Sequence, residues 1–202
     1  MKLSNLPLPA GMIAVAGSVM LAQTPAAQAP AAPTSAPTSP AAQTARAGGA
    51  ASASIKGEGI TGTAQLVERA QGTGSIVDIT VTVSGLKPGM HGVHLHAVGK
   101  CEPDFAAAGG HFDPGPSANT DPDANHPFHM GDIPNLQVGA NGRGTMKIAT
   151  SRVTVSDGPL SLFDADGSAI IIHGNPDQGI TGEPKSGVSG GPRVACGVIS
   201  RK

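Results

Sequence analysis

Seven histidines are the residues of this 202-residue chain whose type and spacing could do chemistry, and all of them lie between positions 91 and 173. His94 and His96 flank a single residue, Leu95. Residues i and i+2 of a strand point to one face, so we expect Val93 and Leu95 to face the core and both imidazoles to project together outward. Such a pair can chelate copper, zinc, nickel or iron. The alternative is two unrelated surface histidines.

A second group of metal-ligand types follows in what reads as a long loop: His111, His126, His129 and Asp132. The last three place two imidazoles and a carboxylate within seven residues. This nitrogen and oxygen set suits Zn²⁺, which takes four ligands and does not require thiolates. Alternatively, His126 is solvated and Asp132 only begins a turn. His173 ends an isoleucine-rich run, where a lone histidine is more often structural than a ligand. Together the histidines favour metal binding.

The elements that must position these side chains read as short strands. Gly 29 and Pro 18 make up more than a fifth of the chain, which disfavours a helical bundle. Apolar and polar residues alternate over 77–84, as in a half-buried antiparallel strand. We predict hairpins over 136–149 and 160–173, with turns at Asn141-Gly142 and Asp166-Gly167, and a last strand over 194–199. The pattern predicts an all-β sandwich or barrel with two long functional loops, 98–134 and 174–192.

Composition and patterning also indicate where the protein works. Residues 1–22 read as a secretory signal peptide and 23–50 as a disordered Ala/Pro-rich linker, leaving one folded domain over 51–202. We therefore expect export to the periplasm or cell envelope without membrane insertion after processing; an uncleaved anchor is the alternative. Export is compatible with a disulfide between the two cysteines, Cys101 and Cys196. A net charge of −1 and the absence of Trp and Tyr argue against nucleic-acid binding.

Five blocks in order across residues 55–202 resemble the copper/zinc superoxide dismutase family. They are His94-Leu95-His96 with Cys101, Gly110-His111-Phe112-Asp113-Pro114, His129-Met130-Gly131-Asp132, His173-Gly174-Asn175-Pro176-Asp177, and Pro192-Arg193-Val194-Ala195-Cys196-Gly197-Val198-Ile199. The resemblance implies an eight-stranded Greek-key β-barrel. It also implies a copper site and a zinc site that share one bridging histidine. The implied copper ligands are His94, His96, His111 and His173, and the implied zinc ligands include His111, His129 and Asp132.

The resemblance assigns further roles. Arg193 would lie beside the copper and attract the anionic substrate, and Asp177 would link a copper histidine to a zinc histidine. Cys101 and Cys196 match the family's disulfide, and His91 matches a structural histidine that is not a ligand. One position departs from the pattern, because Asn119 stands where a further zinc histidine is usual. We expect His126 to replace it; otherwise zinc binds weakly through the remaining ligands and water, or only copper binds.

The implied activity is disproportionation of superoxide to oxygen and hydrogen peroxide by Cu(II)/Cu(I) cycling, with zinc as a structural and tuning metal. In the family's scheme the bridging His111 also delivers a proton to the peroxide. The function would be protection of the cell envelope from superoxide, and family members occur as homodimers and as monomers. Two other functions stay open: a copper-binding or storage protein of the same fold without turnover, and a non-catalytic adhesion or structural β-sandwich.

Overall fold

A computed structural model describes residues 48–115 and 121–202. The predicted signal peptide and residues 23–47 of the predicted linker lie outside them, as does Asn119. Nine strands and one short 3-10 helix, η1 (Phe105–Ala108), form the described part. The strands are β1 (Ala50–Gly57), β2 (Ile60–Gln71), β3 (Gly74–Ser84), β4 (Gly89–His96), β5 (Asp132–Val138), β6 (Arg143–Thr150), β7 (Ala169–His173), β8 (Arg193–Val198) and β9 (Ser200–Arg201).

The sheet closes on itself, which confirms the predicted all-β barrel. Its strand order is β2-β3-β6-β5-β4-β7-β8-β1, and antiparallel pairing of β1 with β2 completes the circle. The connections from β3 to β4 and from β6 to β7 join strands that are not neighbours, as in a Greek key. The two-residue β9 continues β8 after Ile199 and also pairs with β1. None of the described residues forms a helix long and apolar enough to cross a membrane.

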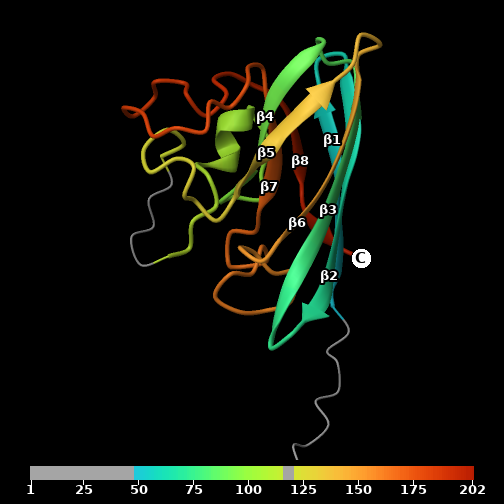
Figure 1. The fold of residues 1–202 in the computed structure, drawn as a ribbon, viewed down its shortest axis with the longest axis vertical. Coiled ribbons are helices and arrows are strands. Elements are labelled where there is room, and N and C mark those ends of the chain that lie inside the picture. The colour runs from blue at the N-terminus through green and yellow to red at the C-terminus, as the bar shows by residue number, and fades with distance from the viewer. Residues whose placement is uncertain (1–47, 116–120) are drawn as a thin grey trace, which may run out of the picture. The chain divides into compact units, whose positions relative to one another are not determined.

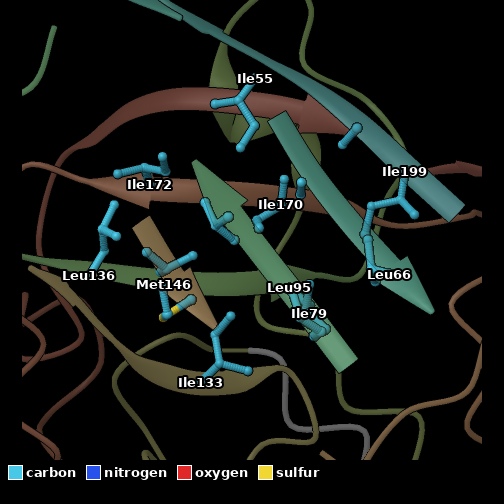
Figure 2. Packing of buried hydrophobic residues seen from close by; sticks show 14 of the residues in the cluster. Ile55, Leu66, Ile79, Leu95, Ile133, Leu136, Met146, Ile170, Ile172 and Ile199 are labelled. Atoms are coloured by element: carbon cyan, nitrogen blue, oxygen red, sulfur yellow. The ribbon is translucent and has the colours of Figure 1, made fainter. Parts of the chain in front are cut away.

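Aliphatic side chains fill the barrel. On β3, Val77, Ile79, Val81 and Val83 are buried while the residues between them are more exposed, as the alternation predicted. Figure 2 shows side chains from several strands, among them Ile55, Leu66, Ile79, Leu95 and Ile170, gathered in one interior cluster. This cluster of described residues is aliphatic apart from Phe112 and Met146, so the metal-ligand side chains must be sought on other faces of the strands.

One predicted hairpin is confirmed and the other is wrong. Residues 136–149 form the β5–β6 hairpin, in which Gly142 takes the left-handed φ of +70° that the tight turn requires. Residues 160–173 form no hairpin. Leu160 and Leu162 turn back and share backbone hydrogen bonds with Thr154, while β7 pairs with β4 and β8. The Asp166-Gly167 turn exists, but the backbone groups of Leu160 and Leu162 before it are already hydrogen-bonded to Thr154 and are not available to pair with β7.

The two long loops lie on one side of the barrel, beside β4 and β5 (Figure 1). The first runs from the end of β4 to the start of β5 and contains η1, and the second joins β7 to β8. Because β4 and β7 are adjacent in the sheet, both loops leave neighbouring strands. This arrangement gives distant histidines a common meeting place.

Candidate metal centre

Strand β4 supplies the first two histidines. Val93 and Leu95 point into the core, and His94 and His96 point to the opposite face, as the spacing predicted. Both imidazoles are nevertheless fully buried, because the loops cover this face of the barrel. The first loop packs close here: Leu95 N donates to Gly131 O at 3.0 Å, and a Cβ at Gly131 would lie 2.2 Å from the Leu95 carbonyl oxygen. Only glycine permits this approach.

Four histidine rings meet outside the barrel wall. His94 and His96 come from β4, His173 ends β7, and His111 is bridged to His96 as an isolated backbone pair. One ligand atom from each of the four lies within 4.8 Å of the others. We call this set the four-histidine cluster. Its donor atoms are buried and have no hydrogen-bond partner: His94 Nδ1, His96 Nε2, His111 Nε2 and His173 Nε2.

The other nitrogen of each ring in this cluster is held by the protein. His96 Nδ1 lies 3.0 Å from Gly109 O, and His173 Nδ1 lies 3.0 Å from Gly191 O. His94 Nε2 lies 2.9 Å from Asp177 Oδ2. Metal-binding histidines show this pattern, because a hydrogen bond at one nitrogen fixes the ring while the other coordinates. A buried nitrogen without a partner is costly, so four that converge fit a bound metal ion.

A second group of potential ligands shares His94 and His111 with the first. His94, His111, His126 and Asp132 also place one ligand atom each within 4.8 Å of one another. His111 Nδ1 lies 2.6 Å from Asp132 Oδ1, and His126 Nδ1 lies 3.3 Å from the same oxygen. His129 stands outside the group of four, but its Nδ1 lies 3.0 Å from Asp132 Oδ2. We call His111, His126, His129 and Asp132 the Asp132 cluster; three imidazoles around one carboxylate are a donor set that suits zinc.

Asp177 connects the two clusters. Its Oδ2 contacts His94 Nε2, and its Oδ1 lies 2.7 Å from His126 Nε2. Asn135 on β5 holds the Asp177 backbone from both sides: the Asn135 amide donates to Asp177 O at 2.8 Å, and Asp177 N donates to Asn135 Oδ1 at 2.9 Å. Asp177 is therefore a fixed double acceptor between a β4 histidine and a loop histidine.

Burial and these contacts set the protonation states. Burial lowers the pKa of His111 to about 4 and that of His173 to about 3. Both rings are therefore neutral at pH 7 and keep a lone pair for a metal. Burial opposes the charged form of His126 as well, but Asp132 and Asp177 outweigh it and raise the pKa of His126 to about 9. Hydrogen bonds from the histidines hold the pKa of both carboxyl groups well below the usual range despite burial.

Arg193 and the disulfide lie beside the four-histidine cluster. Arg193 donates to Phe105 O at 2.7 Å and to Gly109 O at 2.6 Å, and Gly109 O also contacts His96 Nδ1. Cys101 and Cys196 form a disulfide with a Cα–Cα distance of 5.8 Å, which confirms the predicted pairing. It ties the first loop to β8, three residues from Arg193. His91 is buried between the carbonyls of Lys87 and His173 and belongs to neither cluster.

Two supporting residues have no signal in the sequence. Arg152, after β6, donates to His129 O and, at 3.4 Å, to Asp132 O. Asp123, in the first loop, is buried and accepts from Gly187 and Ser189 of the second loop. Neither lies in a periodic pattern or beside a candidate ligand, so only the three-dimensional structure reveals them.

A histidine-lined, carboxylate-supported metal centre outside a closed Greek-key barrel defines a class of metal-binding β proteins. Comparison with known proteins gives the family. Its sequence profile, described as copper/zinc superoxide dismutase (SODC), matches residues 60–199. The chain belongs to the copper/zinc superoxide dismutase family, whose metals are copper and zinc.

The sequences and structures of individual relatives support the same family assignment. The chain is 39% identical over 146 residues to superoxide dismutase [Cu-Zn] 2 of Brassica juncea, covering 70% of this chain and 90% of the relative. It is 40% identical over 151 residues to superoxide dismutase [Cu-Zn] of Deinococcus radiodurans, covering 69% and 77%. Among solved structures, a SOD-like protein from Bacillus subtilis, studied as a double mutant, matches with a TM-score of 0.56 and 33% identity over 72% of this chain and 94% of that one. The clock protein EA4 matches with a TM-score of 0.63 and 26% identity, over 76% and 95%.

Proposed function

We propose that this protein is a superoxide dismutase that converts two superoxide anions and two protons into oxygen and hydrogen peroxide. The observation that carries the proposal is the set of four buried, unpartnered histidine nitrogens that converge within 4.8 Å. His94, His96, His111 and His173 would hold copper through these atoms. Copper, when bound, can cycle between Cu(II) and Cu(I), so it can take an electron from one superoxide and return it to another.

His111 is the residue placed to handle a proton. Its Nε2 belongs to the four-histidine cluster, and its Nδ1 contacts Asp132 in the other cluster. The Asp132 contact fixes the ring, so Nε2 points to the place where substrate would react. Nε2 cannot hold copper and a proton at once, so in a state where it does not coordinate the metal it could carry a proton and pass it to the peroxide product, which is general acid catalysis by a positioned imidazole.

Arg193 would attract the substrate. Its guanidinium is fixed by two backbone carbonyls close to His96, and arginine stays charged at neutral pH. A fixed positive charge beside a recessed site raises the local concentration of a small anion even in a protein of net charge −1. We propose that this steering supports turnover, which a protein that only stores copper does not need.

We propose His126 as the zinc ligand that takes the place of the usual histidine at Asn119. Its support is the Nδ1 atom, which is buried without a hydrogen bond 3.3 Å from Asp132 Oδ1, and the Nε2 contact with Asp177. With His111, His129 and Asp132 it would complete a zinc site of three imidazoles and one carboxylate. Asp132 and Asp177 both support this site, and a copper-only protein would leave His126 and His129 buried without a purpose.

Elemental analysis combined with a superoxide decay assay tests the proposal. We expect the purified protein to bind copper and zinc and to accelerate superoxide decay. His126→Ala should lose much more zinc than copper, while Glu68→Gln, a change at a buried carboxylate whose partners Val155 and Ser156 belong to neither cluster, should retain both metals. Unchanged zinc content in His126→Ala would exclude His126 as a ligand. Binding of both metals without faster superoxide decay would instead identify a copper-binding protein of the same fold.

Export to the periplasm or cell envelope, with protection of that compartment, is part of the proposal and is supported by the apolar, small-residue segment over residues 1–22. Fractionation of cells that express the full chain tests it, and retention of the protein in the cytoplasm would contradict it. A homodimer remains a prediction from the family resemblance, which light scattering during gel filtration can test.

A further inference from the structure

Asp123 is a buried carboxylate that the proposed chemistry does not use. Its residue is 3% exposed and lies three positions before His126 in the first long loop. It accepts three hydrogen bonds, all from the second long loop: Gly187 N at 2.8 Å, Ser189 N at 3.0 Å and Ser189 Oγ at 2.8 Å. Burying a charge is costly unless it is paired and hydrogen-bonded, and these three hydrogen bonds offset that cost for the Asp123 carboxylate.

The segment that Asp123 holds is rich in glycine, and its other backbone hydrogen bonds run from Gly190 N to Gly187 O, from Asn175 N to Gly190 O and from Gln178 N to Val188 O. It reads Gly187-Val188-Ser189-Gly190-Gly191, and its three glycines all have left-handed φ angles, +82°, +112° and +63°. Glycine loses more backbone entropy on ordering than any other residue, so the segment needs external contacts to stay in one conformation. Asp123 supplies three of them from the other loop.

The same segment positions groups of both clusters. Gly191 O contacts His173 Nδ1 at 3.0 Å and so orients a ring of the four-histidine cluster. Val188 O accepts from Gln178 N at 2.8 Å, beside Asp177, which contacts both His94 and His126. Asp123 thus contacts the segment whose carbonyl groups hold His173 directly and Asp177 through its neighbour Gln178, but it contacts neither of those side chains itself. The two loops it joins lie together beside β4 and β5 (Figure 1).

We propose that Asp123 is a positioning residue for the metal centre: its carboxylate fixes residues 187–191 so that the Gly191 carbonyl orients His173 for copper. It makes a second carboxylate link between the loops, separate from Asp177. The inference rests on the proposed function, because it takes His173 to be a copper ligand. The alternative is a structural contact that stabilises the fold without affecting the metal.

The chain offers a matched control in Glu68. This carboxylate is 5% exposed and also accepts from two backbone N–H groups and one serine hydroxyl: Val155 N at 2.8 Å, Ser156 N at 2.6 Å and Ser156 Oγ at 2.9 Å. Its partners follow β6 and belong to neither cluster. Glu68→Gln and Asp123→Asn therefore break equivalent hydrogen bonds, because the new amide N–H faces a donor, but only Asp123→Asn does so behind a proposed ligand.

The test measures Cu(II) affinity by competition with a chelator, and the Cu(II) electron paramagnetic resonance spectrum, on full-length protein loaded with copper and zinc. We expect Asp123→Asn to weaken copper binding about tenfold, within the range for loss of a group that orients a ligand, and to shift the copper hyperfine splitting. Ser189→Ala, which removes one of the three donors, should do the same to a smaller degree. Glu68→Gln should lower the unfolding temperature while keeping wild-type copper affinity and spectrum.

Wild-type affinity and spectrum in Asp123→Asn would overturn the inference, even if the variant were less stable. If Asp123→Asn did not fold, Ser189→Ala would decide, and an unchanged copper spectrum there would overturn it. Equal loss of copper affinity in Glu68→Gln would also overturn it, because the effect would then be one of general stability. Failure of the wild-type chain to bind copper is a different result, which refutes the proposed function itself.

Discussion

Replacing Asp177 with asparagine would test whether one carboxylate supports both halves of the metal centre. The two carboxylate oxygens accept from His94 Nε2 at 2.9 Å and from His126 Nε2 at 2.7 Å. Asparagine keeps one acceptor oxygen and presents an amide N–H in place of the other. That N–H would face a ring N–H, so Asp177→Asn must release one of the two histidines.

The release should fall on His126. His94 is held in β4 by pairing with Ile171 of β7 and Asp132 of β5. His126 lies in a loop, after Asn125, which has a φ of +63°. Loss of a partner that orients a ligand costs roughly 10–100-fold in metal affinity, which corresponds to about 1.4–2.7 kcal/mol. We expect zinc affinity to fall by this factor and copper affinity by less than about threefold.

Chelator competition followed by elemental analysis measures both metals in one sample. Asp166→Asn controls for the change of charge, because Asp166 is exposed and lies in the Asp166-Gly167 turn between β6 and β7. Zinc affinity equal to that of Asp166→Asn would refute the assigned role of Asp177. An equal loss of copper and zinc would refute the argument that the β4 backbone holds His94 without it.

Three other perturbations have defined outcomes. Arg193→Ala should lower turnover at low salt about tenfold or more while its copper and zinc content stays intact. Arg193→Lys keeps the positive charge and should lose less activity. Equal rates for the wild type and both variants in the superoxide decay assay would contradict electrostatic steering by Arg193. The metal-free protein should lose stability as the pH falls from 6.5 towards 4, because the unfolded chain takes up protons that His111 and His173, with pKa values of about 4 and 3, do not bind when folded. The metal-free protein should also lose stability as the pH rises from 6.5 to 9, because folded His126, with a pKa of about 9, holds a proton that the unfolded chain releases. Thermal unfolding measured across this pH range tests both the acid and the alkaline loss of stability. An unfolding temperature that does not change with pH would contradict both. Replacing both cysteines by alanine should lower the free energy of unfolding by at most about 4–5 kcal/mol, as closure of a 95-residue separation predicts, and urea titration measures it.

Strands with an alternating pattern in their own residues could be predicted from sequence. The alternation over β3 and the spacing of His94 and His96 follow from a two-residue period, which no later contact changes. Burial of those two histidines could not be predicted, because it depends on loops that fold over them from other parts of the chain. The hairpin over 160–173 failed for a related reason: a local Asp-Gly turn does not decide which strand its flanking residues pair with.

The supporting contacts were the hardest to predict. His126 is expected to be a ligand because it is the one remaining histidine, and only the family resemblance, not the periodicity or spacing of the residues, implies its contact with Asp177. Arg152 and Asp123 are ordinary charged residues in irregular segments. Their roles arise when residues 20 or more positions away present carbonyl or N–H groups, and periodicity carries no such information.

The two halves of the centre therefore depend on different parts of the fold. His94 and His96 stand on one strand of a closed sheet and His173 ends the next, so three of the four nitrogens proposed for copper are placed by backbone hydrogen bonds of the barrel. His126 and His129 stand on a loop and are held by Asp132 and Asp177. Local opening begins where buried apolar contacts are few, so zinc should be lost before copper under mild destabilisation. Simultaneous loss of both metals during slow acidification would contradict this division.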